Sequence, residues 1–255
     1  MEGLAQLIGH WARGDGPDLL VLGPAELGEL AAPSGALDGC RTGGSVRAGA
    51  GPVVDEAVVV GPAPRPWAGV DEVGRGPLAG PVVACAVVLT PGARIPGLRD
   101  SKALTPASRQ ALMAPILAQA LDARVAIVSH RMVDRLNVLQ ASLRAMAASA
   151  SALEAPYRTL VVDGPVPVPL ERPVAQVPLV DADARVACVG AASVVAKVVR
   201  DRLMEEADRV WPGYGFARHK GYPTPEHLAA LERLGPSPLH RRSFRPVAVA
   251  RPAPA

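Results

Sequence analysis

The pattern of apolar and polar positions from residue 67 onward predicts strands that alternate with helices. Residues 68–73 form a short apolar run that ends in two acids, and residues 82–89 are apolar throughout. A continuous apolar run is typical of a strand that is buried on both faces. By the same pattern we expect further strands at residues 124–129, 159–162 and 174–180.

Four segments around these strands are predicted to be helical. The first begins at Thr105-Pro106, because threonine caps a helix N-terminus and proline suits the first helical position. The others are residues 138–153, 188–210 and 224–234. Alternating strands and helices predict an α/β domain over residues 67–255, which ends in a basic C-terminal tail.

Residues 1–66 have a different composition, with 13 glycines and 7 prolines. That content without a repeat is typical of weak order. We therefore expect residues 1–66 to be a poorly ordered extension or a small appended module.

The charge is distributed unevenly along the chain. Residues 1–66 have a net charge of −4 and residues 67–255 a net charge of +7. A basic domain favours a polyanionic partner such as a nucleic acid. The 3 cysteines have no paired spacing, which indicates a reducing compartment, and we expect a cytoplasmic protein. No apolar run approaches the ~20 residues of a membrane span, so no membrane association is expected.

Acids stand at the ends of three predicted strands. They are the pair Asp71-Glu72, then Asp163 and Asp183. Carboxylates brought to one edge of a sheet can hold two divalent cations about 4 Å apart, as phosphoryl-transfer enzymes do. Consecutive strand residues point to opposite faces, so Asp71 and Glu72 share a site only where the strand bends or ends, and Gly74 makes that plausible.

Lysine is rare in this chain, with 3 lysines against 24 arginines. The lysines are Lys102, Lys197 and Lys220, each within a polar motif. A sequence that otherwise uses arginine suggests that a compact ammonium group is needed at these positions. On the predicted helix 188–210, Ser193 and Lys197 share one face.

Several segments together resemble ribonuclease HII, the bacterial type 2 ribonuclease H. The match covers about residues 67–247 and keeps the order and rough spacing of the family's motifs. These are Gly69–Gly80, Asp100-Ser101-Lys102, Val162-Asp163-Gly164, residues 191–198, Arg200-Asp201-Arg202, His219-Lys220-Gly221-Tyr222 and His240-Arg241-Arg242-Ser243-Phe244.

The resemblance implies a ribonuclease H-like fold, with a mixed five-stranded sheet flanked by helices and a helical C-terminal part. It implies catalysis by Asp71, Glu72, Asp163 and Asp183, which would bind two Mg²⁺ or Mn²⁺ ions. The family has a Gly-Asp pair at the fourth position, where this chain has Ala182-Asp183, so Asp181 remains an alternative to Asp183.

The resemblance also implies the substrate. The family hydrolyses the RNA strand of RNA/DNA hybrids and nicks duplex DNA 5′ of a single ribonucleotide. By motif position, Gly74, Arg75 and Gly76 would contact the 2′-OH, and Tyr222 would pack on the following nucleotide. Lys102, Ser193 and Lys197 are candidates for phosphate contacts. We expect a monomer without a small-molecule cofactor.

Three alternatives remain at this point. The sister enzyme ribonuclease HIII shares the chemistry, but it usually has a different triplet at Gly74-Arg75-Gly76 and a structured N-terminal domain. A non-catalytic nucleic-acid-binding module would be expected to have lost one of the four acids. A metal- or nucleotide-binding protein of another fold would leave the Arg75 and Tyr222 segments unexplained.

Overall fold

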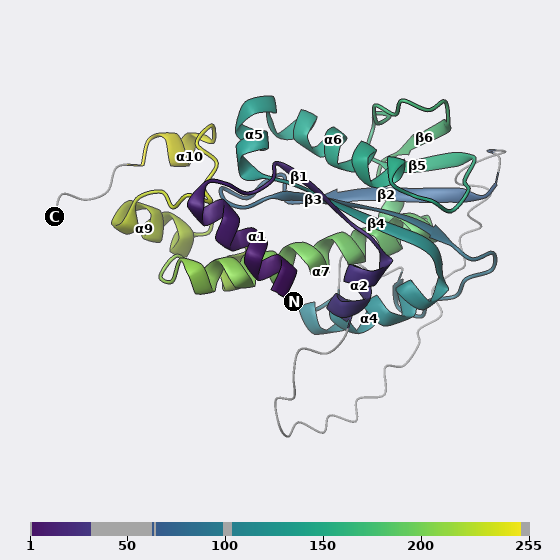
Figure 1. The fold of residues 1–255 in the computed structure, drawn as a ribbon, viewed down its shortest axis with the longest axis horizontal. Helices are drawn as coiled ribbons and strands as arrows, with labels where there is room; N and C mark the ends of the chain where they lie inside the picture. The colour runs from purple at the N-terminus through teal and green to yellow at the C-terminus, as the bar shows by residue number, and fades with distance from the viewer. Residues whose placement is uncertain (1, 32–62, 64, 99–103, 251–255) are drawn as a thin grey trace, which may run out of the picture.

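A single six-stranded sheet organises the molecule (Figure 1). The computed structural model describes residues 2–31, 63, 65–98 and 104–250. The strand order is β1-β4-β3-β2-β5-β6. The strands are β1 (Leu19–Leu22), β2 (Trp67–Val73), β3 (Val82–Leu89), β4 (Ala120–Val128), β5 (Thr159–Asp163) and β6 (Ala175–Leu179).

The sheet is mixed, as predicted. Strands β1, β4, β3 and β2 pair antiparallel in that order, and β5 and β6 continue the sheet in parallel to β2. Strands β2, β4 and β5 therefore point the same way, and their C-terminal ends lie at one edge of the sheet. The acids that end β2 and β5 are brought to this edge.

Helices cover both faces of the sheet (Figure 1). One face packs against α7, with α1, α2 and α4 around it, and the other packs against α6. The helices are α1 (Glu2–Arg13), α2 (Pro24–Ala31), α4 (Pro106–Gln119), α5 (His130–Leu136), α6 (Val138–Ser151), α7 (Ala187–Val210), α8 (Phe216–His219), α9 (Pro225–Leu234) and α10 (Arg245–Ala248), with a 3-10 turn η2 (Ala182–Ala184). Among the described residues, none of these helices has the length and apolarity that a membrane crossing requires.

The closest approach between sheet and helix is at Gly69 of β2. A Cβ atom there would lie 2.3 Å from the backbone nitrogen of Val189, so only glycine lets α7 pack this tightly. The sequence predicted α7 well because its apolar positions continue over the whole helix. Helix α4 also begins as predicted, since the Thr105 hydroxyl accepts a hydrogen bond from the Ser108 backbone N–H at 3.1 Å.

The N-terminal segment departs from the prediction of weak order. Residues 2–31 form α1, β1 and α2, and β1 pairs with β4 as a sixth strand of the sheet. The face of α1 that packs on the core consists of apolar residues at helical spacing, namely Leu4, Leu7, Ile8 and Trp11. Glycine and proline counts outweighed this period in the sequence reading. Residues 32–62 lie outside the described part of the chain.

Leu27 of α2 tests whether this segment belongs to the core. Its side chain is 0% exposed, so Leu27→Ala should lower the free energy of unfolding by about 2–5 kcal/mol. Urea unfolding of the full chain measures this. The matched control is Leu121→Ala, at a leucine that is 52% exposed, which should cost only about 0.5 kcal/mol. Equal effects of the two substitutions would contradict a structural role for α2.

Candidate active site

The two adjacent acids lie where β2 ends. Asp71 is 6% exposed and stands opposite Cys85 in the sheet, on the face that packs against α7. Its Oδ1 accepts a hydrogen bond from the Glu72 backbone N–H at 2.7 Å. Glu72 lines a cleft of about 250 Å³ together with Ser193 and Lys197 of α7. Both acids therefore reach the α7 side, in spite of the alternation expected within a strand.

The other two acids come from the loops beyond the parallel strands. Asp163 ends β5, and its Oδ1 accepts a hydrogen bond from the Ala182 backbone N–H at 2.7 Å. Asp183 lies in η2, is 6% exposed and lines the same cleft as Glu72. Asp181 is exposed and has a left-handed backbone, with φ of 56°. These positions favour Asp183 over Asp181 as the fourth acid.

The carboxylates of Asp71, Glu72 and Asp163 share one electrostatic environment. Burial raises the pKa of Asp71 well above its ordinary value, the charges of Asp163 and Glu72 raise it further, and a hydrogen bond with Ser193 opposes them. Burial also raises the pKa of Glu72, and Arg75 opposes this through an ion pair at 3.3 Å.

The donor set fits a hard divalent cation, although the ligand geometry is not assembled. Within the described residues, no group of three or more His, Cys, Asp or Glu side chains stands in an arrangement that would hold a metal ion. Buried carboxylates that repel one another are stabilised when a cation binds between them, and oxygen is the ligand that Mg²⁺ and Mn²⁺ prefer.

Cationic groups of α7 and α4 border the cleft. Lys197 pairs with Asp201 one turn further along α7, and burial lowers the pKa of Lys197 while Asp201 opposes that shift. Arg109 of α4 also lines the cleft, with Nη2 3.9 Å from Asp201. Sequence reasoning missed Arg109, which lies in no recognisable motif. Ser193 lies beyond the first turn of α7, so its hydroxyl, and no free backbone N–H, serves the site.

Two buried arginines hold the glycine-rich loop that follows β2. Gly74 has φ of +100°, and a Cβ there would lie 2.4 Å from Arg200 Nε. Arg200 Nε donates to the Pro81 carbonyl at 3.0 Å, and Arg241 donates to the carbonyls of Gly74 at 2.6 Å and Arg75 at 3.0 Å. Both guanidinium groups are fully buried. The sequence analysis quoted both arginines within motifs but assigned them no role.

Tyr222 faces this loop and is held by a chain of histidines. Its ring is 39% exposed and would lie 3.4 Å from a Cβ on Gly76. The Ser237 backbone N–H donates to His240 Nδ1 at 3.0 Å, so that nitrogen carries no proton. His240 Nε2 therefore donates to His227 Nε2 at 3.0 Å, and His227 Nδ1 donates to the Tyr222 carbonyl at 2.9 Å.

The remaining predicted site residue, Lys102, belongs to a segment outside the described residues, 99–103. Of the predicted substrate-binding residues, Ser193 and Lys197 line the cleft with Glu72 and Asp183. Gly74, Arg75, Gly76 and Tyr222 lie together on the loop side. The side chain of Arg75 is half exposed and turns toward Glu72.

Comparison with known proteins supports the resemblance seen in the motifs. The family model described as Ribonuclease HII matches residues 68–247. The chain is 52% identical to a Ribonuclease HII of Geobacter sulfurreducens over 183 residues, which is 72% of this chain and 83% of the relative. It is 54% identical to a Ribonuclease HII of Syntrophotalea carbinolica over 183 residues, 72% of this chain and 87% of that one.

The fold is likewise similar to a solved structure. The ribonuclease H2 of Pyrococcus horikoshii OT3 superposes with a TM-score of 0.63 and 28% identity, covering 71% of this chain and 95% of that one. The predicted ribonuclease H-like α/β fold is confirmed. The five strands expected between residues 67 and 180 are all present, and β1 adds a sixth.

Three buried histidines predict a loss of stability in mild acid. Burial lowers the pKa of His130 to about 4 and of His240 to about 3, and it also lowers the pKa of His227. The unfolded chain, with histidine pKa near 6.5, binds more protons between about pH 4 and 6.5. The free energy of unfolding should therefore fall from pH 7 to pH 5, by roughly 1–2 kcal/mol per histidine.

The measurement is urea unfolding at both pH values in an Asp71→Asn background. This substitution removes Asp71, whose raised pKa gives a pH dependence of opposite sign. A free energy of unfolding that is equal at pH 7 and pH 5 would contradict the neutral histidine network.

Proposed function

Because the chain belongs to the ribonuclease HII family, we propose that it is a divalent-metal-dependent endonuclease that nicks duplex DNA 5′ of an embedded ribonucleotide. Family membership identifies an endonucleolytic hydrolase of RNA strands. The metal, the single-ribonucleotide substrate and the products, a 5′-phosphate and a 3′-hydroxyl, are the finer parts of the proposal. RNA/DNA hybrids are the second substrate.

The observation that carries the proposal is the mutual repulsion of Asp71, Glu72 and Asp163 at a buried sheet edge. Like charges in such a place are costly unless a cation compensates them. With Asp183 they would hold two ions, Mg²⁺ or Mn²⁺. When bound, such ions supply an activated water and neutralise charge on the leaving oxygen.

The chain's own residues position the substrate around these acids. The Ser193 hydroxyl orients Asp71, and Lys197 and Arg109 present positive charge to a phosphate at the cleft. The backbone of Gly74–Gly80, held by Arg241, is suited to approach a ribose closely, and the 2′-OH is what distinguishes RNA from DNA there. Tyr222 would pack on the next nucleotide.

The proposed setting follows from the substrate. An enzyme that removes ribonucleotides from duplex DNA and RNA from hybrids serves replication and repair, and we place it in the cytoplasm. We propose that it acts as a monomer, because the four acids and Tyr222 all come from one chain.

The experiment that tests the function is a nicking assay on a DNA duplex with one ribonucleotide. We expect a nick on its 5′ side that requires Mg²⁺ or Mn²⁺ and is abolished by a chelator. Asp183→Asn should lower the rate by roughly 100- to 1,000-fold, because a lost metal ligand removes several kcal/mol of charge stabilisation.

The matched control is Asp181→Asn, two residues away on the exposed side of η2, which should keep nearly the wild-type rate. Duplex binding without metal should persist in both variants. An inactive Asp181→Asn beside an active Asp183→Asn would reassign the fourth acid. A folded wild type that cleaves neither substrate would contradict the nuclease proposal.

Tyr222 gives a separate prediction about selectivity. Tyr222→Ala should reduce nicking at a single ribonucleotide by roughly 5- to 150-fold, the worth of one stacking contact, and reduce cleavage of a long hybrid less. Tyr222→Phe keeps the ring and should preserve the preference. The ratio of kcat/KM values on the two substrates measures it, and an equal loss on both would rule out junction sensing.

A further inference from the structure

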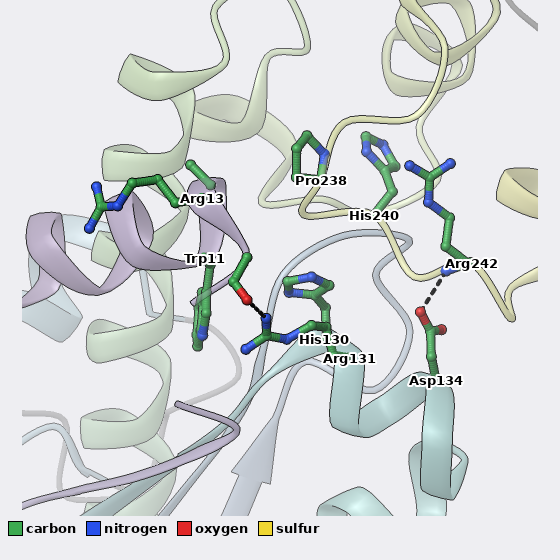
Figure 2. Close-up of a pocket in the computed structure, with 10 residues that line it drawn as sticks. Trp11, Arg13, His130, Arg131, Asp134, Pro238, His240 and Arg242 are labelled. Carbon is green, nitrogen blue, oxygen red and sulfur yellow. Dashed lines mark hydrogen bonds between the residues drawn. The ribbon is translucent and has the colours of Figure 1, made fainter. Parts of the chain in front are cut away.

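A second cleft lies between three segments that are far apart in the sequence. It has a volume of about 270 Å³ and is formed by the end of α1, the start of α5 and residues 238–242 (Figure 2). Its lining includes Trp11, His130, Arg131 and Arg242. Residues 11–14, which form one wall, lie outside the part of the chain that matches the family model.

The cleft opens at the same edge of the sheet as the catalytic acids. Helix α5 follows the C-terminal end of β4, and β4 is separated from β2 by β3 alone. Two strand spacings of about 4.8 Å put β4 roughly 10 Å from β2. This corresponds to about three base-pair steps of 3.4 Å in a duplex that crosses the edge.

The charges in the cleft leave Arg242 available. Asp134 is the one acid in the lining, and its oxygens accept hydrogen bonds from the backbone N–H groups of Arg242 and Ser243 at 2.9 Å. Arg131 binds the Gly14 carbonyl and lies 3.4 Å from Asp18. Within the described residues, the exposed Arg242 guanidinium forms no ion pair.

His130 supplies an unsatisfied polar atom in the middle of this cleft. Its side chain is 4% exposed, and its Nδ1 has no hydrogen-bond partner in the described part of the chain. The ring packs edge-on against Trp11, with centroids 5.9 Å apart, and Figure 2 shows it between α1 and Arg242. A buried polar atom without a partner costs free energy, and an entering ligand oxygen would remove that cost.

We propose that this cleft binds one backbone phosphate of the duplex, about three base pairs from the cleaved bond. Arg242 supplies the charge and His130 Nδ1 the hydrogen bond. The proposal rests on the proposed function, because it gives the duplex a second anchor on the same edge. The N-terminal segment thereby becomes part of the substrate surface.

The test joins a protein change to a substrate change. Single phosphates of a ribonucleotide-containing duplex are replaced in turn by uncharged methylphosphonates, and affinity is measured without metal for the wild type and Arg242→Gln. One position about three base pairs from the ribonucleotide should weaken wild-type binding roughly five- to tenfold at ~0.1 M salt and leave Arg242→Gln unaffected.

Arg158→Gln is the matched control. Arg158 is exposed and precedes β5, at the opposite edge of the sheet, so this variant should respond to every methylphosphonate as the wild type does. Inorganic phosphate should shift the His130 ring signals in NMR spectra of the wild type, and less in Arg242→Gln.

The outcomes separate the two proposals. If every methylphosphonate affects Arg242→Gln and wild type alike while the wild type still nicks the duplex, only the phosphate cleft is overturned. If the wild type neither binds nor nicks the duplex, the proposed function fails first. His130 signals that do not respond to phosphate would also count against the cleft.

Discussion

Two buried guanidinium groups hold together the part of the molecule in which the predicted chemistry lies. Arg200 bonds to the carbonyls of Ala79, Pro81 and Lys220, and Arg241 bonds to those of Gly74, Arg75 and Gly80. Burial lowers the pKa of Arg200 to about 10 and of Arg241 to about 9, so both stay charged at neutral pH. Their hydrogen bonds go to carbonyl oxygens, which fixes the loop rather than neutralising the charge.

This arrangement joins three regions of the chain. The C-terminal segment reaches the loop through Arg241, and it reaches Tyr222 through His240 and His227. Helix α7 reaches the same loop through Arg200 and the acids through Ser193. The wall that would read a ribose and the carboxylates that would bind metal are therefore positioned by one connected set of contacts.

The charges around this set are divided by position. Carboxylates gather at the ends of β2 and β5, where they repel one another, and cations lie behind the loop and along α7. A phosphodiester bound between them would meet positive charge on one side and a metal-binding face on the other. In our proposals, Arg242 and His130 extend this pattern to β4, along the direction in which a duplex would run.

Sequence reasoning was weakest at the N-terminus and at the residues that act from behind the site. The helical spacing of Leu4, Leu7 and Trp11 was present in the sequence, but the surrounding glycines and prolines masked it. Arg109 gave no signal, because an arginine on an amphipathic helix is ordinary until the fold shows what it faces. Arg200 and Arg241 were quoted within motifs, yet nothing local reveals that both are buried.

The sequence by itself determined the α/β class, the strands and helices after residue 67, the family and the candidate acids. These depend on local periodicity and on motifs that are contiguous in the chain. Tertiary structure decided that Asp71 and Glu72 face one cleft, that Asp183 rather than Asp181 lines it, and that residues 2–31 complete the sheet. Those outcomes depend on where strands end and on which distant segments pack together, and no local pattern encodes either.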